Sequence, residues 1–338
     1  MTVKIGASPV NQCMVCRSEG SSLYKNIDDR LFGESKGWDI SNCKKCGLLW
    51  LNPMPNKDEI WKAYQSYYTH SEQAGPPKLL SFLEKPYLQD QYGYHNKNDF
   101  FQKVLAKVAF LFPLAKNRFD FKMLYLPKVK GGKVLDFGCG NGWLIENYRN
   151  LGWDTYGLDF DPKSVEYCQS KGLNVKLGSV DEQNYPDDFF DAITINHVIE
   201  HVYDVEALLM SFSKVLKKNG KLIIATPNTN NWQHQYYKNY WFQLDTPRHL
   251  HLFNNNNLEI LVKRSGFAVE KSFSSIRMDA WSTIVSRGIK RRGSYKVGID
   301  KKTKLDLMIG LSHQVFSAFL SIFNNKLGNE VILIATKK

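Results

Sequence analysis

Short apolar runs alternate with amphipathic stretches in the second half of the chain. Runs of four or five residues are typical of buried strands, and apolar residues that recur every three or four positions are typical of helices. Strands are predicted at 133–136, 155–159, 174–177, 192–196 and 221–225, with helices between them at 144–151, 164–171 and 205–216. Parallel neighbouring strands need a crossover connection, so this alternation predicts a doubly wound α/β fold.

The end of the chain adds further elements to this predicted sheet. A helix is expected at 257–265, followed by closing strands at 267–273 and 330–336. An unusually long insertion, at about 277–328, separates the two closing strands. It is predicted to be helical, because apolar residues dominate 305–311 and 315–323.

The first 130 residues have a different texture. Residues 1–55 contain four cysteines and few apolar runs, which indicates a small module too poor in core residues to fold unaided. Residues 56–130 are rich in aromatic side chains and mostly helical in pattern. The predicted organisation is therefore a module at 1–55, a helical linker or lid at 56–130, and an α/β domain at 131–338.

Composition and charge limit the class of protein. Among 338 residues, 43% are hydrophobic and 13% aromatic, which excludes wholesale disorder. There is neither a signal-like start nor a run of about 18 uncharged apolar residues, so a cytoplasmic protein is expected. The formal charge of +12 favours an anionic partner such as nucleic acid, a phosphorylated substrate or a membrane surface; a solvated basic surface is the alternative.

A glycine-rich turn follows the first predicted strand of the α/β domain. Asp136 ends that strand, and Gly138, Gly140 and Gly142 come before the next helix. Glycine lets the chain turn sharply and lets a ligand approach the backbone, and ligands bind at the carboxyl ends of such strands. On this motif alone a nicotinamide site or a structural turn stays open.

Two carboxylates narrow the identity of this ligand. Asp136 would repel a pyrophosphate and attract an ammonium group. Asp159 ends the next strand, where an acidic residue meets ribose hydroxyls, and Phe160 after it offers a ring face to adenine. The expected ligand is of the adenosine type, with a cationic head and no pyrophosphate.

Four ordered motifs between 131 and 270 resemble those of class I S-adenosylmethionine-dependent methyltransferases. Residues 136–142 look like motif I, and 196–202 resemble the E-H-V signature of the ubiquinone-methyltransferase-like branch; 185–193 and 215–223 resemble two further motifs. Asn219 departs from the usual glycine, and Ser179 from a frequent acidic residue. The resemblance implies a Rossmann-like sheet of seven strands, mainly parallel with an antiparallel last strand. The cofactor residues it implies are Asp136, Gly138, Cys139, Gly140, Asp159, Phe160, Ser179, Val180 and Asn196.

Histidines gather near the expected strand ends. A hydroxyl acceptor needs a base near neutral pKa, and the candidates are His249, His201 and His251, each of which also suits a packing role. The string 247–253 resembles one found in methyltransferases of bacterial glycan gene clusters, which points to His249 and Arg248. A metal held by His197, Glu200 and His201 is the less favoured alternative.

Two C-x2-C pairs occupy the first module. Cys13 and Cys16 with Cys43 and Cys46 can supply four thiolates in tetrahedral geometry, which predicts structural zinc. Redox pairs, in contrast, work singly at a helix start. The segment resembles the N-terminal zinc-binding segment of sugar-modifying methyltransferases, which implies that it holds or covers the acceptor. Nucleic acid is less favoured, because the local density of basic residues is low.

The late insertion contains a basic cluster at 287–296 that is followed by apolar segments up to residue 323. A basic turn beside an apolar helix predicts peripheral contact of 287–323 with an anionic membrane, at the inner membrane face. A helical layer on the sheet or a dimer face are the alternatives.

The leading hypothesis is methyl transfer from S-adenosylmethionine to a sugar, as a nucleotide-linked or lipid-linked intermediate of envelope polysaccharide synthesis. Methylation of oxygen is favoured over methylation of carbon. A small aromatic or quinol acceptor is the second hypothesis. The third is a zinc-ribbon protein that binds nucleic acid or modifies RNA, although 196–199 lack the N/D-P-P-Y/F string of many RNA-modifying enzymes.

Overall fold

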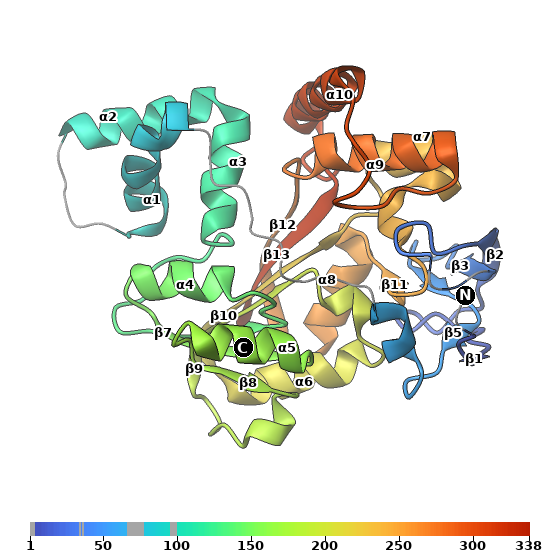
Figure 1. Ribbon diagram of the computed structural model, residues 1–338. Coiled ribbons are helices and arrows are strands. Elements are labelled where there is room, and N and C mark those ends of the chain that lie inside the picture. The colour runs from blue at the N-terminus through green and yellow to red at the C-terminus, as the bar shows by residue number, and fades with distance from the viewer. Residues whose placement is uncertain (1–3, 34, 36, 66–77, 95–99) are drawn as a thin grey trace.

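A seven-stranded sheet forms the centre of the molecule in the computed structural model, which describes the chain except residues 1–3, 34, 36, 66–77 and 95–99 (Figure 1). The strand order is β12-β13-β10-β9-β6-β7-β8, and all neighbours are parallel except that β13 runs antiparallel to β10 and β12. The strands are β6 (Lys133–Phe137), β7 (Asp154–Asp159), β8 (Val175–Leu177), β9 (Phe190–Asn196), β10 (Leu216–Pro227), β12 (Phe267–Ser275) and β13 (Glu330–Lys337). The predicted fold class is confirmed.

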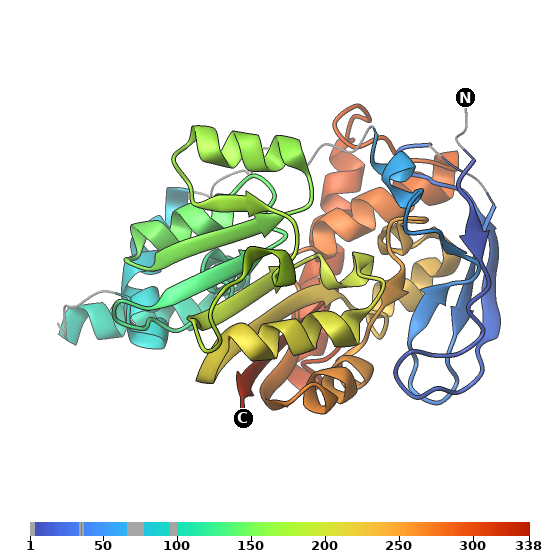
Figure 2. The same ribbon diagram turned by 90° about the horizontal axis from the view of Figure 1, so that it is seen from below.

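Helices cover both faces of this sheet (Figure 2). They include α4 (Trp143–Asn150), α5 (Pro162–Ser170), α6 (Val205–Val215) and α8 (Asn255–Arg264). Alternate strand residues point to opposite faces. Leu135 and Leu222 therefore join a core with α6 and α8, whereas Val134 and Ile223 join a second core with α4. Burial on both faces explains why the strands are almost continuously apolar in sequence.

The helical region before the sheet packs on the α4 side. It consists of η2 (Lys78–Leu83), α1 (Glu84–Tyr92), α2 (Phe100–Val108), η3 (Ala109–Leu111) and α3 (Pro113–Lys122). Tyr87 and Tyr92 both donate to the buried Asp120, which also pairs with Lys116. Trp153 of the α/β domain donates to Tyr94, so this region is anchored to the sheet layer.

The cysteine-containing segment forms a separate small sheet on the side of the molecule opposite α2 (Figures 1 and 2). Its strands are β2 (Ser21–Ile27), β3 (Trp38–Asn42) and β4 (Leu49–Leu51), while β1 (Ala7–Ser8) pairs with β5 (Met54–Pro55). The fourth strand, β11 (His251–Leu252), comes from the α/β domain and pairs with β4. We call residues 4–55 the N-terminal module; its sheet is completed by a distant part of the chain.

The insertion between β12 and β13 contains two helices. They are α9 (Asp279–Arg292) and α10 (Lys304–Phe323), which pack together beside α7 (Trp232–Tyr237). By length and composition α10 is apolar enough to cross a membrane. Short 3-10 turns η1 (Ile60–Tyr64), η4 (Asp181–Gln183), η5 (Ile199–His201), η6 (Lys238–Tyr240) and η7 (Phe242–Leu244) complete the described elements.

Candidate functional site

The glycine turn after β6 leaves space at the carboxyl edge of the sheet. Gly138 has a φ of +72°, and a Cβ there would come within 2.2 Å of Val198 Cγ2. Gly140 has a φ of +53°, and a Cβ there would meet nothing within 4 Å. Gly138 lets the turn pack against the loop after β9. Gly140 leaves an open space that a side chain would fill, and we call this space the cradle.

Two buried carboxylates flank this cradle. Thr194 Oγ1 donates to Asp136 Oδ1 over 2.7 Å, and Gly140 N–H donates to Asp159 Oδ2 over 2.7 Å. Burial, together with the charge of Asp159, raises the pKa of Asp136 to about 7, and burial also raises the pKa of Asp159. A cation placed nearby would stabilise both ionised groups, so the donor set fits a ligand with a cationic head.

The structure places the predicted adenine-binding residues further along the same edge. Phe160 is 60% exposed, and Val180 is buried. Ser179 N–H donates to Glu182 Oε2 over 2.7 Å. Sequence reasoning missed Glu182, whose carboxylate is the acidic group beside this position and comes from η4 three residues later.

Two other predicted cofactor residues offer different groups to a ligand at this edge, one its backbone and the other its side chain. The Cys139 side chain is buried in a small core with Ile145 and Cys168, which leaves its backbone as the part available to a ligand. Asn196 ends β9, and its Oδ1 is buried without a hydrogen-bond partner among the described residues. The Asn196 amide is therefore a polar group suited to bind a ligand.

A cluster of Glu200, His201 and His249 lies beyond the ends of β9 and β10. One ligand atom from each lies within 4.8 Å of the others, so the three could hold a metal ion. The His201 and His249 ring centroids are 4.8 Å apart. We call these three residues the histidine cluster; it differs from the sequence-based alternative in containing His249 in place of His197.

Backbone carbonyl groups fix the orientation of both rings. His201 Nδ1 lies 2.9 Å from Arg248 O, and His249 Nδ1 lies 2.7 Å from Gln243 O. Only a protonated Nδ1 can donate to a carbonyl, so in each neutral ring Nε2 carries the lone pair. His249 Nε2 is 3.9 Å from both Glu200 Oε1 and Asp245 Oδ2, and within the described residues no hydrogen bond occupies it.

The charges around the cluster are set by burial and by ion pairs. Burial would lower the pKa of His197, but its contacts with Glu200 (3.2 Å) and Glu330 (2.7 Å) raise that pKa to about 9. Burial would raise the pKa of Glu200, but His197 and the neighbouring histidines lower it to about 2. Burial and the nearby His249 lower the pKa of His201 to about 4. At neutral pH, Glu200 is thus ionised and His201 is neutral.

The third predicted catalytic histidine lies outside this cluster. His251 belongs to β11, within the sheet of the N-terminal module. Burial lowers its pKa to about 4. Its role as a base stays a prediction, but His249 has the more suitable position.

A buried ion pair joins the cluster to the N-terminal module. Arg248 is completely buried and contacts Asp29 Oδ1 at 2.7 Å and Asp245 Oδ1 at 2.6 Å. Its guanidinium also donates to Ala63 O, and the next residue, Tyr64, has its hydroxyl 3.0 Å from His201 Nδ1. Sequence reasoning missed Asp29 and Asp245, because Asp29 lies 219 positions from Arg248 and no local pattern links them.

The four cysteines of the N-terminal module form one compact group. The Sγ atoms of Cys13 and Cys46 are 3.5 Å apart, those of Cys16 and Cys43 3.3 Å, and those of Cys16 and Cys46 3.9 Å. Four sulfurs at 2.3 Å from a tetrahedral zinc lie about 3.8 Å from one another, so the group has the dimensions of a zinc site. The Asn254 and Asn257 amides donate to Cys46 O, which ties the group to α8.

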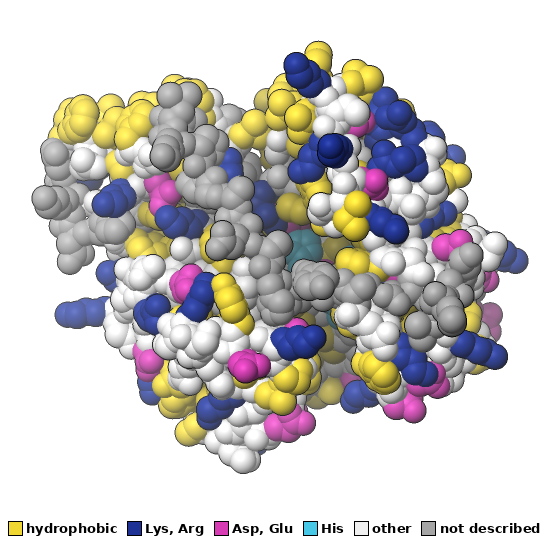
Figure 3. Space-filling model, in the orientation of Figure 1, with side chains coloured by type: hydrophobic (Ala, Val, Ile, Leu, Met, Phe, Trp, Pro, Cys, Tyr) yellow, Lys and Arg dark blue, Asp and Glu magenta, His cyan; other side chains and the backbone are white. Residues whose placement is uncertain are grey.

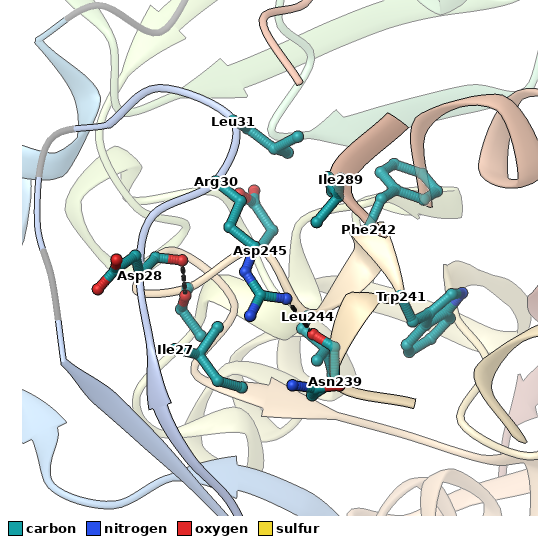
Figure 4. A pocket seen from close by; sticks show the side chains of 11 residues that line it. Ile27, Asp28, Arg30, Leu31, Asn239, Trp241, Phe242, Leu244, Asp245 and Ile289 are labelled. Atoms are coloured by element: carbon teal, nitrogen blue, oxygen red, sulfur yellow. Dashed lines mark hydrogen bonds between the residues drawn. The ribbon is translucent and has the colours of Figure 1, made fainter. Parts of the chain in front are cut away.

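A small pocket lies between the N-terminal module and the segment that contains η6 and η7 (Figure 4). Arg30 donates to Asn239 O across it, and Trp241 and Phe242 contribute aromatic surface. Asp245 lines the pocket and also approaches His249, so the pocket adjoins the histidine cluster. Figure 3 shows a histidine side chain at the bottom of a hollow in the middle of the molecule.

Curated relatives match the central part of the chain. A ubiquinone biosynthesis O-methyltransferase of Pelagibacter ubique is 36% identical over 115 residues, which are 32% of this chain and 48% of that protein. The corresponding enzyme of Rhodopseudomonas palustris is 30% identical over 132 residues, or 38% and 52% of the two chains. The chain thus spans about half the length of these relatives.

Solved structures resemble the chain at lower identity. An S-adenosylmethionine-dependent methyltransferase from Mesorhizobium loti has a TM-score of 0.45 and 19% identity, covering 65% of this chain and 98% of that one. One from Archaeoglobus fulgidus has a TM-score of 0.44 and 21% identity, covering 71% and 100%. A family model described as a methyltransferase domain matches residues 102–272, half of the chain. The chain therefore belongs to the methyltransferase domain family.

Proposed function

We propose that this protein transfers the methyl group of S-adenosylmethionine to a hydroxyl group of a sugar, as a nucleotide-linked or lipid-linked intermediate of envelope polysaccharide synthesis. The cofactor part rests on the cradle at Gly140 and on the buried carboxylates of Asp136 and Asp159, which suit a cationic adenosine ligand. Membership of the methyltransferase domain family supports the same assignment. When bound, this cofactor supplies a methyl group that is already activated by a positively charged sulfur.

Residues of the chain would hold the cofactor at one end of the site. Asp159 has remaining lone pairs for ribose hydroxyls after it accepts the Gly140 and Asp161 N–H groups. Phe160 offers an exposed ring to the adenine. Asp136 faces the cationic end. Together these residues align the cofactor, and alignment with exclusion of water is most of what methyl transfer requires.

His249 is the proposed base. Its Nε2 carries the lone pair and would take the proton of the acceptor hydroxyl as the oxygen bonds to the methyl carbon. The imidazolium so formed would be stabilised by Glu200 and Asp245, both 3.9 Å from Nε2. His201 is a poorer base because its pKa is lowered to about 4, and we assign it to positioning, through its contact with Arg248 O.

The observation that carries the choice of a sugar is the set of buried polar atoms around the cluster. Asn196 Oδ1 and Gln243 Oε1 are buried without a hydrogen-bond partner among the described residues. Buried polar groups are stable when they are hydrogen-bonded, so these two favour an acceptor with several hydroxyl groups.

A quinol or another small aromatic acceptor is the second candidate. The specific observation in its favour is that the curated relatives are named ubiquinone biosynthesis O-methyltransferases. Such an acceptor also presents a hydroxyl, and His249 would serve it in the same way.

We further propose that Cys13, Cys16, Cys43 and Cys46 hold structural zinc. The separations between the sulfur atoms support this proposal. Zinc would keep the strand β4 in place for its pairing with β11, directly after the histidine cluster.

Labelled methyl transfer tests these proposals. The protein would be incubated with methyl-labelled S-adenosylmethionine and, separately, with nucleotide-linked sugars, with catechols or hydroquinones, and with RNA. We expect label in the sugar, and at least about a hundredfold loss in His249→Ala with unchanged cofactor affinity. His313→Gln, a histidine of α10, is the matched control and should keep full activity. Label only in the aromatic acceptor or only in RNA would overturn the sugar assignment.

A further inference from the structure

The long helix α10 has its apolar surface turned away from the protein. The residues that it buries are small or polar: Asp306, Gly310 and Ser317. A Cβ at Gly310 would approach Ala280 O to 2.9 Å, and Ser317 Oγ accepts from Trp232 Nε1. The large apolar side chains point to solvent instead, with exposed fractions between 45% and 77%: Leu305, Leu307, Met308, Leu311, Val315, Phe316, Phe319, Ile322 and Phe323. This is the reverse of the usual pattern of a surface helix.

The exposed face of α10 is long and almost without charge. A helix of 20 residues is about 30 Å long, and between 305 and 323 only Asp306 is charged. Asp306 is turned inward, where it pairs with Arg287. An exposed apolar surface of this extent marks a site of contact with another apolar phase.

A second apolar patch lies on the same side of the molecule. It belongs to α2, η3 and the start of α3, where Phe100 is 81% and Leu111 75% exposed. Figure 1 shows α2 and α10 at one side of the structure, and Figure 3 shows hydrophobic side chains gathered there over both elements. The two patches come from separate parts of the chain, and a broad surface can contact both at once.

Basic residues directly precede α10. Eight basic residues and one acidic residue, Asp300, lie between 287 and 304. Most of the basic side chains are exposed, and among them are Lys290, Lys296 and Lys301. This segment is complementary to an anionic surface, whereas a second copy of the chain would bring another segment of the same sign.

From the inverted helix, the second apolar patch and the adjacent basic segment, we propose that α10 and residues 100–114 dock on an anionic lipid surface. The helix would lie in the interface rather than cross the bilayer, because it packs along α9 and the chain returns from it into β13 of the central sheet. The proposed docking does not depend on which acceptor the enzyme uses. For a lipid-linked acceptor, docking would place the site next to the membrane that holds the substrate.

Vesicle binding tests the apolar half of this proposal. The probes are vesicles of phosphatidylcholine alone and vesicles that also contain phosphatidylglycerol, with binding measured by flotation. We expect stronger binding to the anionic vesicles. Leu311→Ser, Val315→Ser and Ile322→Ser combined should weaken it by about a hundredfold or more, since burial of each side chain is worth about a tenfold change. The matched control is Met210→Ser with Ile260→Ser, two similarly exposed residues on α6 and α8, and should bind as the wild type does.

The basic half has its own test. Lys290→Gln, Lys296→Gln and Lys301→Gln combined should weaken binding to anionic vesicles by about a hundredfold, at about fivefold per charge, and reduce the dependence of binding on salt. Equal binding by wild type and both triple variants would overturn the proposal. So would a wild-type dimer, seen by sedimentation equilibrium, that fails to float with vesicles and that the serine variant converts to monomers. Near-ultraviolet circular dichroism checks that each variant is folded.

Discussion

Replacing Asp29 by asparagine removes one of the two charges that hold Arg248 in the interior. Arg248 and Asp29 are both almost completely inaccessible, and they make two hydrogen bonds, of 2.9 Å and 2.7 Å. Loss of one partner of a buried ion pair costs about 3–5 kcal/mol, because the other charge stays buried. Arg248 keeps Asp245, so we expect the lower end, about 3 kcal/mol, out of a total stability on the order of 5–15 kcal/mol.

The same substitution should reduce methyl transfer. Arg248 precedes His249, and its carbonyl accepts the Nδ1–H of His201, so a shift of Arg248 moves both rings of the histidine cluster. The cofactor cradle lies on other strands and should keep its affinity. We therefore expect turnover to fall by at least about tenfold while the Kd for S-adenosylhomocysteine, measured by calorimetry, stays constant.

Urea unfolding followed by circular dichroism measures the change in the free energy of unfolding. Asp28→Asn is the matched control, because Asp28 is the neighbouring residue, is less buried, and accepts a hydrogen bond from Gly37 N–H that asparagine can also accept. It should change stability by less than about 1 kcal/mol. If Asp29→Asn lay within about 0.5 kcal/mol of the wild type and kept its turnover, the reasoning from the buried pair would be refuted.

Three further predictions concern the cofactor, the proposed zinc and the half-buried His197. Asp159→Ala should weaken S-adenosylhomocysteine binding by about tenfold or more in calorimetry, because the ribose loses its acceptor and Gly140 N–H its partner; an unchanged Kd would remove the ribose assignment. Cys43→Ser should lower the zinc content, measured by plasma mass spectrometry, and the thermal midpoint; one full equivalent of zinc at normal stability would contradict the four-cysteine site. His197 has its pKa raised to about 9 from an ordinary 6.5, so its stabilising pairs are fully present below about pH 6.5 and are lost as the pH rises through 9. At about 1.4 kcal/mol per pKa unit, urea unfolding between pH 7 and 10 should show a loss of about 3 kcal/mol that His197→Gln abolishes; identical pH dependence in the two proteins would exclude His197 as the source.

The α/β core is predictable from the sequence because its signals are local. Each central strand carries its own apolar run, and the predicted strands were found with their ends shifted by at most a few residues. The largest shift is in β10, predicted at 221–225, which begins at Leu216. The residues after Leu216, up to Gly220, are not apolar, and they join the strand because Leu216 pairs with Phe190 before a register shift. Pairing between strands, which no single window contains, sets that boundary.

The candidate site divides in the same way. The proposed cofactor half is formed by the ends of neighbouring strands within one short stretch of sequence. The positions of Asp136, Gly140 and Asp159 relative to these strands therefore predict it. The acceptor half depends on contacts between distant segments: Tyr64 reaches His201 across 137 positions, and Asp29 reaches Arg248 across 219. A prediction from local pattern could therefore name His249 but not the distant groups that position the histidine cluster.

One continuous stretch of the chain connects the four-cysteine group to the histidine cluster. Arg248 binds the N-terminal module through Asp29, His249 belongs to the histidine cluster, and β11, which follows, pairs with β4. Asn254 then donates to Cys46 O while its side chain caps α8. Because residues of this stretch belong in turn to the module and to the site, the module cannot move as a separate lid without shifting His249. The N-terminal module is thus better understood as a wall of the proposed acceptor site, and the role we propose for zinc is to hold the strands of that wall in place.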